Sequence, residues 1–360
     1  MGAFGFCFVG RAVLLLKLFT VSLAWGREGH YAICKIAQAL LDSTNKYSRV
    51  TKLISDGIIA VRLMIVERGS VSTMMDGYSN SDVNLNPHLE SGKQCLRYFQ
   101  GLLTEDAATA VRLLLPDYAD GDLAAVCSWP DEIRHHFGWR WTSPLHYVDT
   151  PDFRCNYEYC RDCHDSAGNK DRCVSGAIYN YSMQLTTYQD PIAVFDADNL
   201  TEALMFLSHF IGDIHQPLHV GFVGDEGGNT IIVRWYRRKT NLHHVWDNMI
   251  IESAMKEFYH SSIDEMIQAI KRNMLDWSAE IPSWENCVSN HTVCPDLYAS
   301  ESVRLACKFA YRNATPGSIL TDDYFLSRLP IVEKRLAQSG VRLAATLNRI
   351  FSSTPSRSQQ

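Results

Sequence analysis

The sequence predicts a mainly α-helical, single-domain protein with a minor β-hairpin. Six segments place apolar residues three and four positions apart, which is the spacing of one helix face. Residues 229–238 alternate apolar and polar side chains as a strand does, and they follow Gly227 and Gly228. The chain has 360 residues, of which 46% are hydrophobic, so it can bury the core of one large domain or of two small ones.

The expected helices begin with a segment in which Ile33, Ile36 and Leu40 share one face. Thr104 is expected to cap the second helix, and Thr201 stands at the start of the third. The six helices are expected over residues 30–41, 103–115, 200–215, 262–277, 300–312 and 327–351.

Two segments lack a helical or strand pattern. Residues 39–101 contain many turn-forming residues and no sustained period, so we expect an irregular insertion there, although a loop of that length is unusual inside a compact domain. The polar end of the chain, residues 353–360, is expected to be a disordered tail. The sequence therefore indicates one domain over residues 25–352, interrupted near 39–101.

Residues 1–24 have the features of a signal peptide. Arg11 precedes an apolar run, and Ser22 and Ala24 are small residues where a signal peptidase prefers them. The run is too short and interrupted for a transmembrane helix, and no later stretch has the pattern of one. We expect cleavage before Trp25 and no stable membrane association.

Cysteines and glycosylation tripeptides agree with a secreted protein. An oxidising compartment favours disulfides over a zinc finger or a redox CxxC motif for Cys155, Cys160, Cys163 and Cys173. The expected location is the secretory pathway, with the mature protein extracellular, in the endoplasmic reticulum or in the vacuole. The candidate glycosylation sites are Asn180, Asn199, Asn290 and Asn313.

Two pairs of residues indicate metal chemistry. His209 and Asp213 lie four positions apart in an apolar helix, and His243 and Asp247 repeat that spacing. Buried charged groups need a partner, and imidazole with carboxylate suits zinc. The net charge of −6 means that any anion binding must be local. Further candidate ligands are His30, Asp131, His146 and His219, which are too many for one ion. Two or three clustered divalent ions indicate phosphoester hydrolysis.

The chain resembles the plant bifunctional nucleases, which belong to the zinc-dependent single-strand-specific nuclease family that fungi also have. The resemblance covers Trp25 to about Gln38 and Leu102 to about Ser352. The motifs that carry it are WGREGH, CSWPD, TSPLHYVDTPD, FLSHFIGDIHQPLHVGF, DEGGNT and NLHHVWD. It implies a monomeric multi-helix bundle of the phospholipase C/nuclease type, stabilised by disulfides.

The resemblance also implies three zinc ions per chain. The first would be bound by Asp131, His146, His209 and Asp213. The second would be bound by His30, the shared Asp213, and the α-amine and carbonyl of Trp25. The third would be bound by His219, His243 and Asp247. Asp213, Asp131 and His146 would thereby be catalytic residues.

The activity implied by the resemblance is hydrolysis of single-stranded DNA and RNA to 5′-phosphorylated products. A 3′-nucleotidase activity on 3′-nucleotides accompanies it. Tyr147 would stack on a base or belong to the core, and Asn248 would contact substrate or cap a turn. Asp149 would orient a ligand histidine.

Other polar residues carry weaker signals. A basic run could guide a nucleic-acid strand or form a solvated face; it comprises Arg234, Arg237, Arg238 and Lys239. Six histidines are expected to be structural or at the surface, namely His135, His136, His164, His215, His244 and His291.

The chain departs from its family at the insertion and at two cysteines, Cys95 and Cys160. Setting aside Cys7 of the signal peptide, the other eight match the family's four-disulfide framework. The resemblance implies that Cys34 pairs with Cys127 and that Cys163 pairs with Cys173. Two alternatives stay open: a trinuclear-zinc phospholipase C of the same fold, and a non-catalytic glycoprotein inactivated by the insertion.

Overall fold

The computed structural model describes residues 25–55, 105–189, 197–287 and 291–351. Several sequence predictions fall outside these residues: the signal peptide of residues 1–24, the tail of residues 353–360, Thr104, Cys95 and Asn290. The part of the insertion from residue 56 onward is also outside them.

The described part of the chain is built from helices, as the apolar periodicity predicts. It holds twelve α-helices: α1 (Arg27–Ser55), α3 (Glu105–Leu114), α4 (Trp129–Ile133), α5 (Tyr159–Asp162), α6 (Val174–Thr186), α7 (Ala197–Asp213), α8 (Leu242–His244), α9 (Ile250–Phe258), α10 (Ile263–Asn273), α11 (Ile281–Glu285), α12 (Pro295–Leu305) and α13 (Asp322–Phe351). Short 3-10 or π turns join several of them. No helix among the described residues combines the length and hydropathy that a bilayer span requires.

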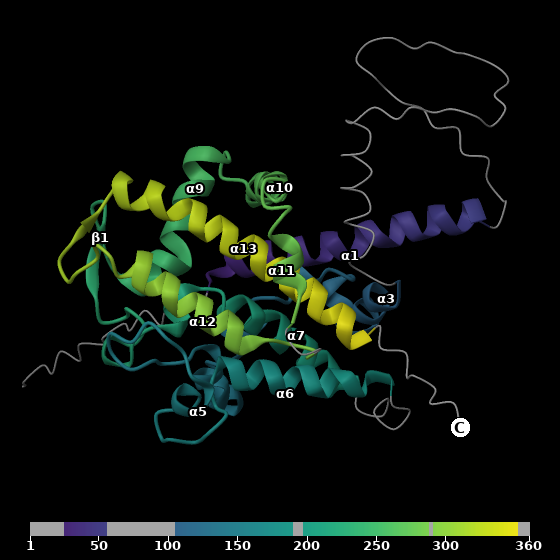
Figure 1. The fold of residues 1–360 in the computed structure, drawn as a ribbon, viewed down its shortest axis with the longest axis horizontal. Helices are drawn as coiled ribbons and strands as arrows, with labels where there is room; N and C mark the ends of the chain where they lie inside the picture. The colour runs from purple at the N-terminus through teal and green to yellow at the C-terminus, as the bar shows by residue number, and fades with distance from the viewer. Residues whose placement is uncertain (1–24, 56–104, 190–196, 288–290, 352–360) are drawn as a thin grey trace, which may run out of the picture.

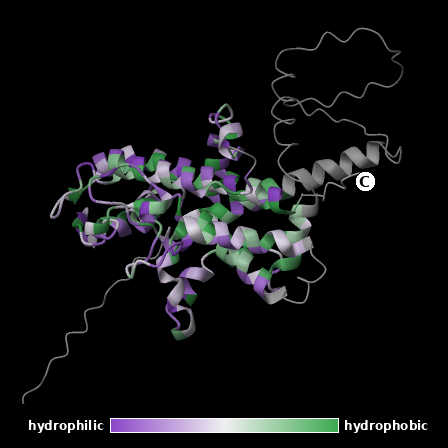
Figure 2. Ribbon diagram, turned by 60° about the horizontal axis from the view of Figure 1, so that its bottom comes forward, coloured by the Kyte–Doolittle hydropathy of each residue, from purple (hydrophilic) through white to green (hydrophobic). Residues whose placement is uncertain are grey.

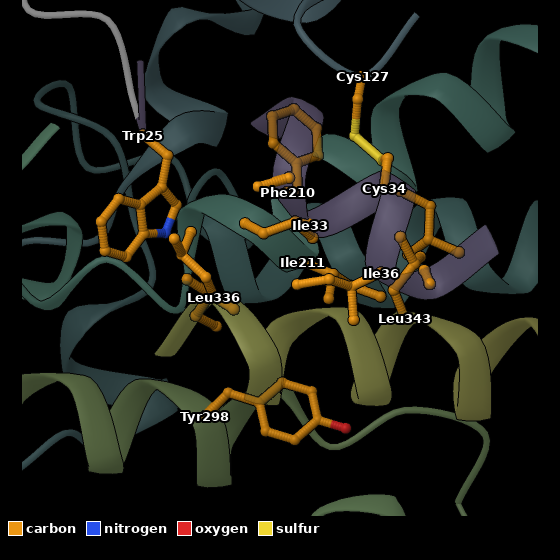
Figure 3. Packing of buried hydrophobic residues seen from close by; sticks show 14 of the residues in the cluster. Trp25, Ile33, Cys34, Ile36, Cys127, Phe210, Ile211, Tyr298, Leu336 and Leu343 are labelled. Atoms are coloured by element: carbon orange, nitrogen blue, oxygen red, sulfur yellow. A yellow bond between two sulfur atoms is a disulfide. The ribbon is translucent and has the colours of Figure 1, made fainter. Parts of the chain in front are cut away.

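The core forms where α1, α7 and α13 pack together. α13 runs diagonally across the middle of the molecule, and α6 lies beside α7 below it (Figure 1). Buried side chains from α1, α7, α12 and α13 meet between these helices (Figure 3). The helices mix hydrophobic and hydrophilic residues along their length, as helices with one buried face do (Figure 2).

The sheet is small and lies at one edge of the molecule (Figure 1). β1 (Ile232–Trp235) pairs antiparallel with β2 (Arg238–Asn241) and parallel with β3 (Ile319–Leu320). The expected continuous strand over residues 229–238 is therefore corrected, because the chain turns at Tyr236 with a positive φ of 52°. The hairpin that the sequence predicts is made within this segment.

Several helix boundaries differ from the sequence prediction. α12 begins at Pro295 and α13 at Asp322, both before the predicted starts, and α10 ends at Asn273. The boundaries of α1 and α7 differ for reasons that the structure shows. The insertion was expected to begin near residue 39, but α1 continues to Ser55. Residues 39–55 contain no glycine or proline to stop the helix, and Gly57 follows soon after its end. α7 begins at Ala197, before Thr201, and the Thr201 hydroxyl donates to the carbonyl of Leu114 at 2.7 Å. Thr201 therefore links two helices and does not start one.

The described residues form four disulfides, two between distant segments and two within short ones. Two are the pairs expected from the sequence, Cys34–Cys127 and Cys163–Cys173. The other two are Cys155–Cys307 and Cys287–Cys294, whose pairing the sequence left open. Cys160 is a free, exposed cysteine among the described residues. The eight paired cysteines are those assigned to the disulfide framework.

Candidate metal centre

Eight histidine and aspartate side chains from distant segments converge at the ends of short helices. Each is at most 6% exposed although all are polar. His30 comes from the first turn of α1, Asp131 from α4, and His209 with Asp213 from the last two turns of α7. The other four lie in short helical segments: His146 in residues 137–146, His219 in 217–220, His243 in α8 and Asp247 in 245–249.

The first group of donors surrounds the Oδ2 atom of Asp213. His146 Nδ1 lies 3.0 Å from this oxygen, and His209 Nε2 lies 3.1 Å from it. The two histidine nitrogens are 3.0 Å apart. Asp131 Oδ1 completes the group, at 3.5 Å from His146 Nδ1 and 3.7 Å from His209 Nε2. Four residues that the sequence placed around one ion are thus gathered in one cluster.

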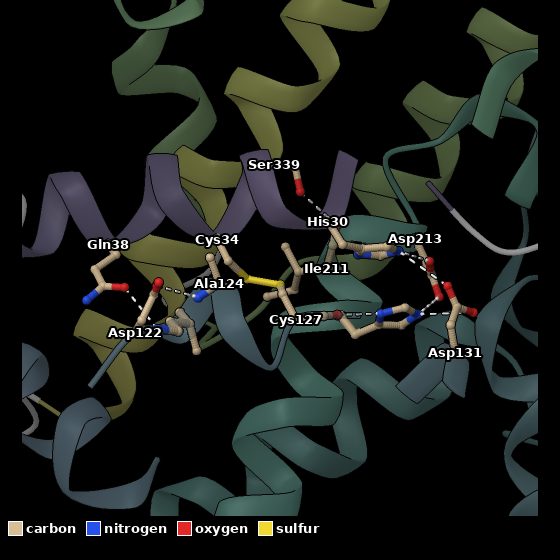
Figure 4. The surroundings of a disulfide bond; sticks show 12 residues. His30, Cys34, Gln38, Asp122, Ala124, Cys127, Asp131, Ile211, Asp213 and Ser339 are labelled. Carbon is tan, nitrogen blue, oxygen red and sulfur yellow. Dashed lines mark hydrogen bonds and ion pairs between the residues drawn. A yellow bond between two sulfur atoms is a disulfide. The ribbon is translucent and has the colours of Figure 1, made fainter. Parts of the chain in front are cut away.

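The second group uses the other oxygen of the same carboxylate. His30 Nε2 lies 3.2 Å from Asp213 Oδ1 and 4.0 Å from Asp131 Oδ2 (Figure 4). The rings of His30 and His209 stack at 3.8 Å between centroids. A Cβ at Gly212 would lie 2.8 Å from His30 Nδ1, so a glycine allows α1 to approach α7 this closely. Asp213 therefore lies between both groups, as the sequence analysis expects.

The third group lies around Asp247. His243 Nε2 is 3.4 Å from Asp247 Oδ2, and His219 Nε2 is 3.8 Å from Asp247 Oδ1. His219 Nδ1 is also 3.8 Å from Asp213 Oδ1, so the third group adjoins the other two. Gln216 Nε2 donates to Asp247 Oδ1 at 2.6 Å and holds this carboxylate in place.

Backbone carbonyls orient three of the histidine rings. Nδ1 of His209 donates to Cys127 at 2.8 Å, Nδ1 of His219 to His146 at 2.7 Å, and Nδ1 of His243 to Gly227 at 2.6 Å. A proton held on Nδ1 leaves the Nε2 lone pair facing the donor group, which is the tautomer that binds a metal.

The expected role of Asp149 is corrected by these contacts. Among the described residues, Asp149 makes no hydrogen bond to a ligand histidine. Burial, with Glu226 and Asp225 nearby, raises the pKa of Asp149 to about 6. It therefore lies near other acidic residues, and main-chain oxygens orient three of the histidine rings.

Several donor atoms of the centre have no hydrogen-bond partner. They include both ring nitrogens of His30, His219 Nε2, Asp131 Oδ1 and Asp213 Oδ1, all buried. Buried polar atoms without a hydrogen bond are costly and rare. Of these atoms, His30 Nε2 and Asp213 Oδ1 face each other at 3.2 Å, whereas His30 Nδ1 faces Gly212. Burial lowers the pKa of His146 to about 4, so its ring is neutral at physiological pH. Clustered imidazoles and carboxylates whose donor atoms lack partners fit divalent metal ions.

The first residue of the expected mature chain lies beside the third group. Trp25 is fully buried in the core. The backbone N–H of Gly26 donates to the carbonyl of Asp247 at 2.9 Å. A Cβ at Gly26 would lie 1.9 Å from Asn248 Nδ2, so Asn248 packs against this segment. Asn248 therefore contacts the start of α1, which neither sequence alternative for it foresaw.

Tyr147 and Arg134 stand at the edge of the centre. Tyr147 is 38% exposed, so its ring does not belong to the core, one of its two expected roles. Arg134 is buried, and its guanidinium lies 3.4 Å from Asp131 Oδ1. Arg134 is not among the residues predicted from the sequence, although its position one helical turn after Asp131 was a signal.

Arginine side chains of α13 form hydrogen bonds to His215, just after the last turn of α7. The Arg335 guanidinium donates to the His215 carbonyl at 2.9 Å, and Arg342 donates to His215 Nε2 at 2.9 Å. Glu301 accepts from both arginines, at 2.9 and 2.6 Å. His215 is thus structural, as expected, and this network fixes the turn that carries Asp213.

The chain is similar to nucleases along most of its length. The S1/P1 Nuclease family matches residues 99–352, a range that begins at the end of the insertion and leaves out Trp25 and His30. Endonuclease 4 of Arabidopsis thaliana is 57% identical over 346 residues, 96% of this chain and 95% of the relative. Endonuclease 5 of that plant is 61% identical over 345 residues, 95% and 96% of the two chains. Nuclease P1 of Penicillium citrinum is 29% identical over 269 residues, 71% of this chain and 94% of the relative.

Proposed function

The chain belongs to the S1/P1 nuclease family, and on that premise we propose that it is a secreted, zinc-dependent endonuclease of single-stranded nucleic acid. The proposed reaction hydrolyses phosphodiester bonds of single-stranded DNA and RNA to 5′-phosphorylated products. A 3′-nucleotidase activity on 3′-nucleotides is part of the proposal.

One observation carries the proposal: three buried groups of possible metal donors adjoin one another. His209 belongs to two of these groups, and the two oxygens of Asp213 face His30 and His146 separately. The mutual distances in the first group range from 3.0 to 3.7 Å. Zinc binds nitrogen and oxygen at about 2.0–2.2 Å, so the donors of a tetrahedral site lie about 3.3–3.6 Å apart. The nitrogen and oxygen donors suit zinc, and the observed separations lie near this spacing, which supports the proposal.

We propose that the first ion is held by Asp131, His146, His209 and Asp213. The second would be held by His30, Asp213 and Trp25, and the third by His219, His243 and Asp247. Zinc bound there supplies activation of water at neutral pH and neutralises charge on the phosphate.

The protein's own residues would orient the substrate and complement its charge. The guanidinium of Arg134, 3.4 Å from Asp131 Oδ1, would add a positive charge at the edge of the donor groups that can complement a phosphate. The exposed ring of Tyr147, adjacent to His146, offers a base a stacking surface worth roughly 1–3 kcal/mol. Carbonyls that fix the histidine rings keep this arrangement ready before substrate arrives.

Secretion and processing are proposed on separate grounds. Four disulfides suit an oxidising compartment. Asn180, Asn199 and Asn313 are exposed, which glycosylation requires. Removal of residues 1–24 would free the α-amine of Trp25. The backbone N–H of the next residue, Gly26, donates a hydrogen bond to the Asp247 carbonyl. We also propose that the protein acts as a monomer.

The two alternatives have less support. The relatives are named nucleases, which disfavours a phospholipase C. The donor groups are assembled in the described part of the chain despite the insertion, which disfavours an inactivated glycoprotein.

The test uses purified secreted protein with analysed zinc content. It is incubated with single-stranded DNA, RNA and phosphatidylcholine, with and without chelator. We expect chelator-sensitive cleavage of both nucleic acids, 5′-phosphate ends on the products and no phospholipid hydrolysis. Cleavage of phosphatidylcholine alone, or nucleic-acid cleavage that chelator leaves unchanged, would contradict the proposal.

A further inference from the structure

The outer face of the small sheet carries a pair of directly opposed cations. In β1, Ile232 and Arg234 are exposed while Val233 and Trp235 are buried, so one face of the strand points to solvent. Arg234 faces Lys239 across the antiparallel pair, and Ile319 of β3 stands on its other side. Like charges in directly opposed positions destabilise a sheet. The face is therefore suited to an anion that would relieve this repulsion.

The turn adds Arg237 at the tip of the hairpin, while Arg238 pairs with Trp235 and so starts on the opposite face of the ladder. Both arginines are exposed. Arg234 donates to the Arg237 carbonyl at 3.4 Å, which directs its side chain toward the tip. Within the described residues, none of the four cations forms an ion pair with a carboxylate. A basic patch thus forms on a protein whose net charge is −6.

The patch is rigid because the inner face of the hairpin is anchored. Trp235 is buried, and its Nε1 donates to the Ser253 hydroxyl of α9 at 3.0 Å. The Trp235 ring packs edge-on against Tyr324 and Phe325 of α13. The backbone N–H of Arg234 donates to the Ser318 carbonyl at 2.8 Å. The cations therefore sit on a fixed surface, which reduces the ordering cost of binding.

The same hairpin leads directly into the third donor group. Leu242 N–H donates to the Ile231 carbonyl at 2.9 Å, and His243 N–H donates to Gly228 at 3.4 Å. Lys239 precedes His243 by four residues, a span of at most about 14 Å of extended chain. A strand held at the donor groups would have its flanking phosphates within reach of this face.

We propose that the basic face of the hairpin, formed by Arg234 and Lys239 with Arg237 at the tip, binds the phosphate backbone of the substrate strand outside the cleaved bond. This inference rests on the proposed nuclease function. Charge complementarity and continuity with the donor groups single out a nucleic-acid strand as the occupant. The face would raise kcat/KM for long strands relative to short substrates, and it would not contact the reacting phosphate.

The test compares substrates of different length. Arg234→Gln combined with Lys239→Gln neutralises the opposed pair. The matched control, Lys271→Gln with Arg272→Gln, removes the same charge from α10, which lies away from β1 (Figure 1). For each protein, kcat/KM is measured on a long single-stranded oligonucleotide and on a 3′-mononucleotide over a range of salt concentrations.

We expect the hairpin variant to lose kcat/KM on the long strand at low salt and to keep wild-type activity on the mononucleotide. The slope of log kcat/KM against log salt should become shallower by about 1.4, since each lost phosphate contact on a single strand removes roughly 0.7. The α10 variant should behave as wild type. Unchanged kinetics on the long strand, or equal losses on both substrates, would overturn the proposal. If the wild-type protein cleaves neither substrate, the proposed function itself fails.

Discussion

The imidazole Nδ1 of His209 donates a hydrogen bond of 2.8 Å to the carbonyl of Cys127, whose sulfur is bonded to Cys34 of α1 (Figure 4). The disulfide therefore fixes a residue that orients a ring of the first donor group. It also ties this residue to the helix that carries His30.

Replacing Cys34 and Cys127 together by alanine should lower both stability and activity. Loss of a native disulfide typically costs about 2–5 kcal/mol, and this bond spans 93 residues. The control is Cys287→Ala with Cys294→Ala, a bond that spans seven residues. Melting temperature, zinc content and nuclease rate are compared. If the Cys34/Cys127 variant kept wild-type zinc content and rate, the disulfide would have no part in orienting His209.

Asp213→Ala should reduce activity more than any other single change among the donor residues. Its two oxygens face different groups, so its loss weakens the sites of two ions. The reduction in kcat/KM should exceed the roughly 10–100-fold typical of changes just outside a metal site. His30→Ala is the comparison, because His30 belongs to a single group. Full zinc content in Asp213→Ala, or an equal or larger loss in His30→Ala, would count against a shared ligand.

Chelation should lower the melting temperature as well as the activity. The donors come from α1, α4, α7 and the segments around His146, His219 and Asp247, so bound ions connect parts that separate on unfolding. Each ion at 100 times its Kd adds about 2.7 kcal/mol to the free energy of unfolding. Calorimetry with chelator, and again after zinc is restored, checks this. An unchanged melting temperature in chelator would be incompatible with a buried multi-metal centre.

Periodicity predicted six of the twelve helices in the described residues, and it missed α4, α5, α6, α8, α9 and α11. Apolar spacing identified the core faces of α1, α7 and α13, because burial decides those positions. Thr201 looked like a helix start from its type alone. Its hydroxyl instead donates a hydrogen bond to the Leu114 carbonyl. This contact joins distant segments, and no local sequence pattern encodes it.

Two pairs of donor residues could be predicted from the sequence because their spacing is local. His209 with Asp213, and His243 with Asp247, are neighbours along helical turns, so their proximity is a local property. The Glu301–Arg342 pair is separated by 41 residues, and the Arg342–His215 contact by 127. Such contacts depend on how α12, α13 and α7 pack, which neither composition nor spacing determines.

The Glu301 pair with Arg342 and Arg335 should make stability depend on acid pH. Burial alone would raise the pKa of Glu301, but the hydrogen bonds and charges of these arginines lower it to about 2. A carboxyl with a lowered folded-state pKa stabilises the fold above its unfolded value of 4.5, and this stabilisation is lost as pH falls toward 2.

The measurement is the free energy of unfolding of metal-free wild type and Glu301→Gln between pH 7 and pH 2. The wild type should be more stable at pH 7, and the difference should shrink below about pH 4.5 as Glu301 takes up a proton. A difference that stays constant over this range would show that ionised Glu301 contributes nothing.

Cleavage before Trp25 should be a step in assembling the second zinc site. Trp25 is buried, and Gly26 is bonded to the Asp247 carbonyl at 2.9 Å, so the start of the mature chain has a fixed place in the centre. An α-amine has a pKa of about 7.7–8.0, and zinc must displace its proton at mildly acidic pH. A residue before Trp25 would turn this amine into an amide, which is a poor ligand.

We therefore expect a protein with one alanine added before Trp25 to keep the ion at His219, His243 and Asp247. It should lose occupancy at the His30 group and most of its activity. Secreted and alanine-extended proteins are compared by N-terminal sequencing, zinc analysis and nuclease assay. A useful control is Trp25→Phe with correct cleavage, which keeps the amine and should keep the zinc content. Equal zinc content and equal rates in the secreted and extended forms would show that the amine is not a ligand.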